Sequence, residues 1–150
     1  MIVLTQLLKE QITLSQADTE FMYDAYTQMG LSKEWAIEDL QNLLEWLNGL
    51  PDTITLYRLL YLNDEEDINK EELGDHYSDN KKELLYNHHN KGSIYGDYGE
   101  NAILLTVKVN KDQIDILNTL HNNIMYPHEQ EITLKDKGKG AILQDIKEII

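Results

Sequence analysis

The sequence predicts an α+β fold in which helices come first and a mainly antiparallel sheet follows. Three observations lead to this prediction. Apolar residues recur at helical spacing through residues 1–50. From Thr53 onward, β-branched and aromatic residues gather in short runs separated by turn residues. The chain has 150 residues and is 41% hydrophobic, enough for one domain with a packed core.

The helical part is expected to contain three helices. Apolar residues close to the N-terminus predict the first, and Ser15 is a candidate cap for the second, which Gly30 ends. Ser32 is a candidate cap for the third, which ends at Gly49. The apolar stripe of this third helix indicates core packing, including both tryptophans, Trp35 and Trp46.

The second part begins with the run Thr53–Leu62, whose β-branched and aromatic residues predict a buried strand. Gly74 marks a turn. Residues 79–86 predict a short helix with Ser78 near its start, and a glycine-rich loop is expected over 87–100.

The clearest strand in the chain is expected over residues 102–109. Asn110 is then a candidate cap for a helix through Leu120, after which a loop carries Tyr126. Glu131 lies in the next strand-like run, and Lys137-Gly138-Lys139-Gly140 indicates a turn. The last ten residues predict one more strand or helix.

The chain is strongly acidic. Its 13 basic and 27 acidic residues give a formal net charge of −14. Contacts with nucleic-acid phosphates need a cationic surface, so this balance argues against a nucleic-acid-binding protein. It leaves an alternative open: a non-catalytic acidic binding protein, such as a phage-encoded inhibitor that imitates the charge of DNA. The acid-rich stretch 64–72 motivates that alternative, although solvated loop residues are the simpler account.

Cysteine is absent, which excludes disulfides and thiolate metal sites and fits a reducing compartment. The N-terminal residues carry no basic leader, and no apolar stretch reaches membrane-spanning length. We therefore expect a soluble cytoplasmic protein. The five histidines show no metal-ligand spacing, so no metal site is predicted.

Two polar residues of the second part have both a structural and a functional interpretation. Arg58 lies between apolar neighbours, where an unpaired guanidinium is costly. It forms either a structural salt bridge or a fork that grips a phosphate. Ser78 is either a turn or cap residue, or a hydroxyl that binds a ribose.

Glu129 and Glu131 form a pair of carboxylates one residue apart. On an extended backbone they point the same way, because side chains alternate across a strand. The structural interpretation is a pair of solvated glutamates in an acidic protein. The functional one is negative charge placed where positive charge develops, as in the oxocarbenium-like transition state of glycosidic cleavage.

These segments together resemble the ADP-ribosyltransferase family of the arginine-serine-glutamate type, in particular its small bacterial and phage-encoded members. The resemblance covers roughly residues 53–135 and implies a split, mainly antiparallel β core with an NAD cleft between its sheets and the N-terminal helices packed on it. It rests on three runs: Thr53-Ile54-Thr55-Leu56-Tyr57-Arg58, Leu73-Gly74-Asp75-His76-Tyr77-Ser78-Asp79-Asn80 and Glu129-Gln130-Glu131-Ile132.

The resemblance implies a role for each matching residue. Arg58 contacts the NAD phosphates and supports the site. Ser78 binds the nicotinamide-side ribose and positions Glu131, which is the catalytic glutamate. Glu129 holds or deprotonates an attacking arginine of the target, and Tyr126 is our candidate for target recognition.

Other residues of the site are less well determined by the resemblance. His76 and Tyr77 belong to the NAD-binding segment, and Tyr86 or Tyr95 is expected to stack on nicotinamide. Two departures stand out. The family commonly has glycine after the arginine, where this chain has Leu59, and its Ser-Thr-Ser motif is replaced by Ser78-Asp79-Asn80.

The resemblance therefore predicts a mono-ADP-ribosyltransferase that uses NAD as co-substrate and modifies a bacterial protein on arginine. It would act in the cytoplasm of a bacterium or of a phage-infected host cell, with no nucleic-acid or membrane partner.

Overall fold

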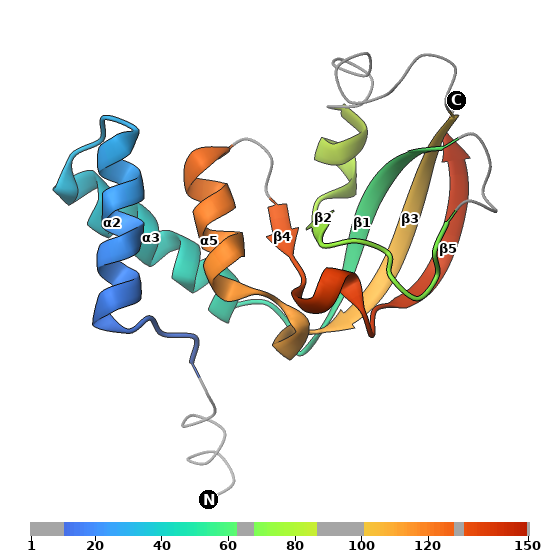
Figure 1. Cartoon of the computed structure of the whole chain (residues 1–150), viewed down its shortest axis with the longest axis horizontal. Coiled ribbons are helices and arrows are strands. Elements are labelled where there is room, and N and C mark those ends of the chain that lie inside the picture. Colours follow the sequence, from blue (N-terminus) through green and yellow to red (C-terminus); the bar gives the residue numbers. More distant parts are fainter. Residues whose placement is uncertain (1–10, 63–67, 87–100, 128–130, 150) are drawn as a thin grey trace, which may run out of the picture. The chain divides into compact units, whose positions relative to one another are not determined.

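The structure is a computed structural model of the whole chain, and it describes residues 11–62, 68–86, 101–127 and 131–149 (Figure 1). The chain forms two compact units, Met1–Leu50 and Pro51–Ile150. Their boundary falls where the sequence changes from helical to strand periodicity. The predicted α+β class is confirmed, whereas the first expected helix lies outside the described residues.

The first unit contains α2 (Gln16–Gln28) and α3 (Lys33–Asn48). Both begin at the predicted serines. Ser15 Oγ accepts a hydrogen bond from the Asp18 N–H at 3.1 Å, and Ser32 Oγ accepts one from the Trp35 N–H at 3.2 Å. Each bond satisfies one of the backbone donors that the first turn of a helix leaves without a partner.

The two helices bury a shared apolar core of Met22, Ala25, Tyr26, Ala36, Leu40 and Leu47. Tyr26 lies at its edge, where its hydroxyl donates to Asp39 Oδ2 at 2.5 Å and its ring meets Trp35 edge-on. Burial, with the neighbouring carboxylate, raises the pKa of Tyr26 far above its ordinary value. The prediction that Trp35 is core is wrong, because this residue is in the first turn of α3 and is 48% exposed.

The second unit is built on a five-stranded sheet in which every neighbouring pair is antiparallel. The spatial order is β4-β2-β1-β3-β5. The strands are β1 (Thr53–Leu62), β2 (His76–Ser78), β3 (Asn101–Asn110), β4 (Glu131–Thr133) and β5 (Ile142–Ile149). The strands predicted from residues 53–62 and 102–109 are confirmed, and the last residues form a strand rather than a helix.

The expected split into two sheets is not found, since the described strands form one sheet. Its two parts nevertheless differ in length. β1, β3 and β5 are long and pair over many residues, whereas β2 and β4 are three residues each. The long and short parts are joined at a single register pair, Tyr57 with Ser78. The position of β2 is therefore a weak point that other contacts must secure.

Short helices connect the strands. A helix at residues 81–86 follows β2, and η3 (Lys135–Gly138) follows β4. The helix predicted to begin at Asn110 starts later. A single turn, η2 (Lys111–Gln113), comes first, and then Asp115 caps α5 (Ile116–Met125) by accepting the Asn118 N–H at 3.2 Å.

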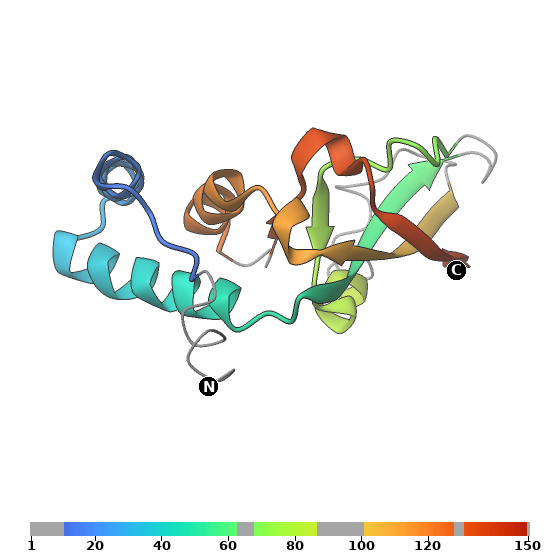
Figure 2. The ribbon, with the colours of Figure 1, turned by 90° about the horizontal axis from the view of Figure 1, so that it is seen from below.

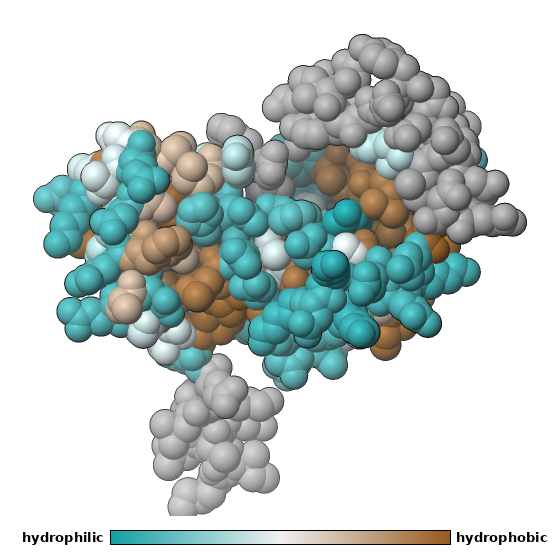
Figure 3. Space-filling model, viewed as in Figure 1, coloured by the Kyte–Doolittle hydropathy of each residue, from teal (hydrophilic) through white to brown (hydrophobic). Residues whose placement is uncertain are grey.

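The core of the second unit is centred on β3, whose residues 102–105 are all buried. Burial of consecutive residues means that both faces of this strand are covered. Most of the described surface seen in Figure 3 is hydrophilic, as the charge of the chain predicts. No helix within the described residues is long and apolar enough to cross a membrane.

Two glycines have similar positive φ angles but different surroundings, so comparing them distinguishes the cost of backbone strain from the cost of a steric clash. Gly30 has φ +79° and open space where a Cβ would lie, whereas a Cβ on Gly138 (φ +77°) would lie 2.1 Å from the carbonyl oxygen of Gly74. We expect Gly30→Ala to cost roughly 1–2 kcal/mol for the left-handed conformation alone. Gly138→Ala should cost clearly more, because a backbone carbonyl must move as well. Amide hydrogen exchange, which reports opening of each unit separately, gives both free energies. Equal losses in the two variants would contradict the close approach at Gly138.

Candidate functional site

Three neighbouring strands carry the arginine, the serine and the second glutamate of the resemblance, Arg58, Ser78 and Glu131. β2 pairs with β1 through Tyr57 and Ser78, and with β4 through three pairs that include Ser78 with Glu131. Directly paired residues of antiparallel strands have their side chains on the same face. Tyr57, Ser78 and Glu131 therefore form a row across one face of the sheet, which we call the glutamate face. His76, two residues before Ser78, belongs to the same face.

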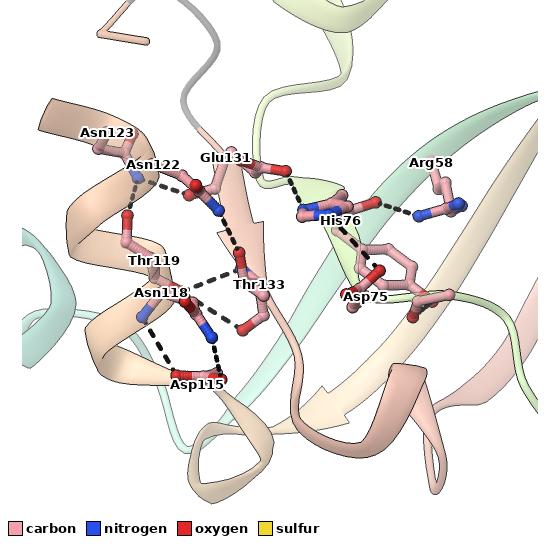
Figure 4. A network of polar contacts seen from close by, with 12 residues as sticks. Arg58, Asp75, His76, Asp115, Asn118, Thr119, Asn122, Asn123, Glu131 and Thr133 are labelled. Atoms are coloured by element: carbon pink, nitrogen blue, oxygen red, sulfur yellow. Dashed lines mark hydrogen bonds and ion pairs between the residues drawn. The ribbon is translucent and has the colours of Figure 1, made fainter. Parts of the chain in front are cut away.

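The carboxylate of Glu131 contacts the imidazole of His76 (Figure 4). His76 Nδ1 and Glu131 Oε1 form an ion pair when the ring is protonated, and His76 Nε2 lies 3.6 Å from Asp75 Oδ1. The Glu131 side chain is 15% exposed and that of His76 is 53% exposed. The half-exposed imidazole of His76 thus orients the largely buried carboxylate of Glu131. The resemblance implies NAD binding by His76, and the structure places this residue against the candidate catalytic glutamate.

Side chains of α5 hold the backbone of β4 along its outer edge. Asn123 Nδ2 donates to the carbonyl of Glu131 at 2.7 Å, and Thr119 Oγ1 accepts from the Thr133 N–H at 2.9 Å. Thr119 Oγ1 also approaches the Thr133 carbonyl at 3.3 Å. These groups take the place of a further strand for the carbonyl of Glu131 and for the N–H and carbonyl of Thr133. The backbone position of Glu131 is consequently fixed by a helix.

The contribution of α5 was not predicted, although the sequence carries a signal for it. Thr119 and Asn123 are four residues apart, on the same side of the helix as the buried Leu120 and Ile124. Both polar residues are buried, at 0% and 7% exposure. Polar residues in an apolar stripe need hydrogen-bond partners, and here the partners are backbone groups of β4.

Ser78 is used in a local turn. It is 3% exposed, and its Oγ accepts the N–H of Asn80 at 3.0 Å and approaches the carbonyl of the same residue at 3.3 Å. Asn80 Oδ1 in turn accepts the Glu83 N–H at 3.0 Å, at the start of the helix at 81–86. The structural interpretation of Ser78 as a turn residue is therefore confirmed. Ribose binding by its hydroxyl stays a prediction.

Arg58 follows Tyr57 on β1 and therefore points to the opposite face of the sheet. Its Nη1 donates to the carbonyl of His76 at 2.9 Å, and its guanidinium lies 5.7 Å from the centre of the Tyr77 ring. A Cβ on Gly74 would be 2.5 Å from Arg58 Cζ, so a side chain there would displace the guanidinium. Arg58 Nε is buried and has no hydrogen-bond partner within the described part of the chain. These contacts support β2, whereas phosphate binding by Arg58 stays a prediction.

Tyr77 completes the support on this opposite face. The residue is 3% exposed, and its hydroxyl donates to the Gly74 carbonyl at 2.9 Å. Burial raises the pKa of Tyr77 to about 12, although the positive charge of Arg58 acts against this rise and Asp75 adds to it. The resemblance assigns Tyr77 to the NAD-binding segment. In the structure its buried side chain lies on the face of the sheet opposite Glu131.

The remaining predicted residues are not brought into the row. Tyr86 ends the helix at 81–86 and is 61% exposed, and Tyr126 follows α5 and is 58% exposed. Glu129 and Tyr95 lie outside the described residues. Stacking on nicotinamide, target recognition and acceptor activation by these residues stay predictions.

Comparison of the chain with models of protein families, with curated proteins and with solved structures finds no match. A function must therefore be inferred from the residues themselves. Within the described residues no group of three or more histidine and acidic side chains is arranged to hold a metal ion.

The raised pKa of Tyr77 predicts an alkaline loss of stability. Folding favours the neutral phenol, so its contribution is complete below the ordinary pKa of 10.0 and disappears as pH rises toward about 12. Tyr77→Phe cannot ionise. It should be less stable at neutral pH by roughly 1 kcal/mol, for the lost hydrogen bond, and lose less stability on alkaline titration. Urea unfolding of both proteins across this pH range measures the difference. Parallel pH curves for the two proteins would show that Tyr77 does not couple to folding.

Proposed function

We propose that this protein is a mono-ADP-ribosyltransferase that transfers ADP-ribose from NAD to a protein, on arginine. The observation that carries the proposal is the pairing of Ser78 with Glu131 on one side and with Tyr57 on the other. Three motif segments that are far apart in the chain thereby occupy three adjacent strands. A serine and a glutamate are direct cross-strand partners, which supports the proposal.

In the proposed reaction the nicotinamide-side ribose of NAD lies against Ser78 and Glu131. The bond between the anomeric carbon and the pyridinium nitrogen breaks, and its electron pair leaves with nicotinamide. Positive charge then develops on the ribose ring. The carboxylate of Glu131 is suited to stabilise it, because negative charge held in place before the reaction needs no reorganisation during it.

The contacts around Glu131 support this role. His76 orients the carboxylate from the solvent side, and Asn123 fixes the backbone carbonyl of the same residue. A group held at both its backbone and its side chain is preorganised for one geometry. A solvated strand glutamate would need neither contact.

The second half of the proposed reaction belongs to Glu129. A guanidinium nitrogen of the target arginine bonds to the anomeric carbon, and Glu129 takes the proton that this nitrogen loses. Arg58 acts by supporting the strand that carries Ser78, through its bond to the His76 carbonyl. The two glutamates then have separate tasks.

Replacing Glu131 tests the first step. Glu131→Gln keeps the shape of the side chain and removes its charge, so we expect nicotinamide release from NAD to fall by roughly 10²–10³-fold. Release is measured by chromatography of the reaction mixture. Glu148→Gln, at an exposed position on β5, is the matched control and should react as the wild type. Unchanged release in the Glu131 variant would refute the proposal.

Replacing Glu129 tests the acceptor step separately. Glu129→Gln should still hydrolyse NAD to nicotinamide and ADP-ribose, because Glu131 is intact. It should lose the transfer of ADP-ribose to arginine-containing proteins. Intact-mass analysis of a cell lysate incubated with labelled NAD detects the transferred group. A variant that still modifies arginine would show that Glu129 does not choose the acceptor.

A further inference from the structure

We propose that Lys81, rather than Arg58, supplies the positive charge that meets the pyrophosphate of NAD. This inference rests on the proposed function and adds a binding residue and a direction for the substrate. The nicotinamide-side ribose lies at the Glu131 end of the glutamate face, and the phosphates lie at the Tyr57 end.

Arg58 occupies the side of the sheet opposite the glutamate face. The arginine is adjacent to Tyr57, so the two side chains point to opposite faces. Its contacts agree, because Tyr77, over which the guanidinium lies, alternates with Ser78 on β2. Gly74 lies next to the same guanidinium, since a Cβ added there would be 2.5 Å from Arg58 Cζ. The contacts of the Arg58 guanidinium therefore lie on the face opposite Glu131.

Lys81 is a cation that lies close to Tyr57 on the glutamate face. Its Nζ is 6.0 Å from the centre of the Tyr57 ring, and Tyr57 is the end member of the row with Ser78 and Glu131. Lys81 begins the helix at 81–86, which follows directly from the turn at Ser78 and is seen beside β1 in Figure 2. The lysine is exposed, so its ammonium group can reach an incoming ligand.

Because the chain is strongly acidic, binding of the NAD phosphates needs a local positive charge. NAD brings two phosphate charges to a chain of net charge −14, and Glu131 adds a carboxylate on this face. Of the other basic groups that the register places on this face, His76 is engaged with Glu131, and Lys108 and Lys147 lie on β3 and β5, on the far side of Tyr57 from Glu131. An ammonium is an effective phosphate ligand because it acts as a compact charge that needs no fixed approach.

The dimensions fit this direction of binding. Adjacent strands lie about 4.8 Å apart, so the row from Glu131 through Ser78 to Tyr57 spans about 10 Å across the sheet. A ribose and the phosphate attached to it can extend along such a row. Tyr57, partly exposed beneath Lys81, then forms the floor under the phosphate end.

The experiment compares Lys81→Ala with Lys82→Ala, which removes the adjacent exposed lysine of the same helix. Equilibrium titration measures the Kd of each protein for NAD and for nicotinamide riboside, which lacks phosphate. We expect Lys81→Ala to weaken NAD binding roughly tenfold or more, with binding of nicotinamide riboside unchanged. Lys82→Ala should bind both ligands as the wild type does. The wild-type NAD affinity should also fall with added salt more steeply than that of Lys81→Ala.

The outcomes separate this inference from the proposed function. If the wild type binds NAD and Lys81→Ala binds it equally well, the phosphate assignment is wrong while the proposed function stands. Equal weakening in both lysine variants would show a general charge effect and would also refute the assignment. If the wild type binds no NAD, the proposed function falls, and the inference falls with it.

Discussion

The position of β2 is the constraint on which the rest of the second unit depends. This strand has three residues and a single register pair with β1, yet it determines which side chains share a face with Glu131. A shift of one residue would turn Ser78 and His76 to the other face and bring Tyr77 in their place. Backbone pairing over so short a length is weak, so the register is held by side chains on the opposite face.

Those side chains form a compact support. Arg58 bonds to the carbonyl of His76, Tyr77 bonds to that of Gly74, and Gly138 approaches the Gly74 carbonyl so closely that a Cβ has no room. Each contact fixes the backbone just before or within β2. The arginine therefore matters to the glutamate face even though its guanidinium points away from it.

A second support acts on β4 from outside the sheet. Thr119 and Asn123 hydrogen-bond to the edge backbone of β4, which satisfies the backbone groups at these positions. Buried polar contacts of this kind are directional, so they fix a backbone more tightly than apolar packing does. Glu131 is thus positioned by β2 on one side and by α5 on the other. The arrangement gives an otherwise short strand rigidity, which the catalytic role proposed for Glu131 requires.

Local elements of this protein were determined by the sequence itself. The run of β-branched and aromatic residues delimits β1, and Ser15 and Ser32 begin their helices because capping is a contact between near neighbours in the chain. Local pattern could not reveal which residues meet across strands. Only the tertiary structure placed His76 against Glu131, put Arg58 on the face opposite Glu131 and left Trp35 exposed. The reason is that strand register and helix docking depend on contacts between distant segments, and periodicity within a segment carries no information about its partner.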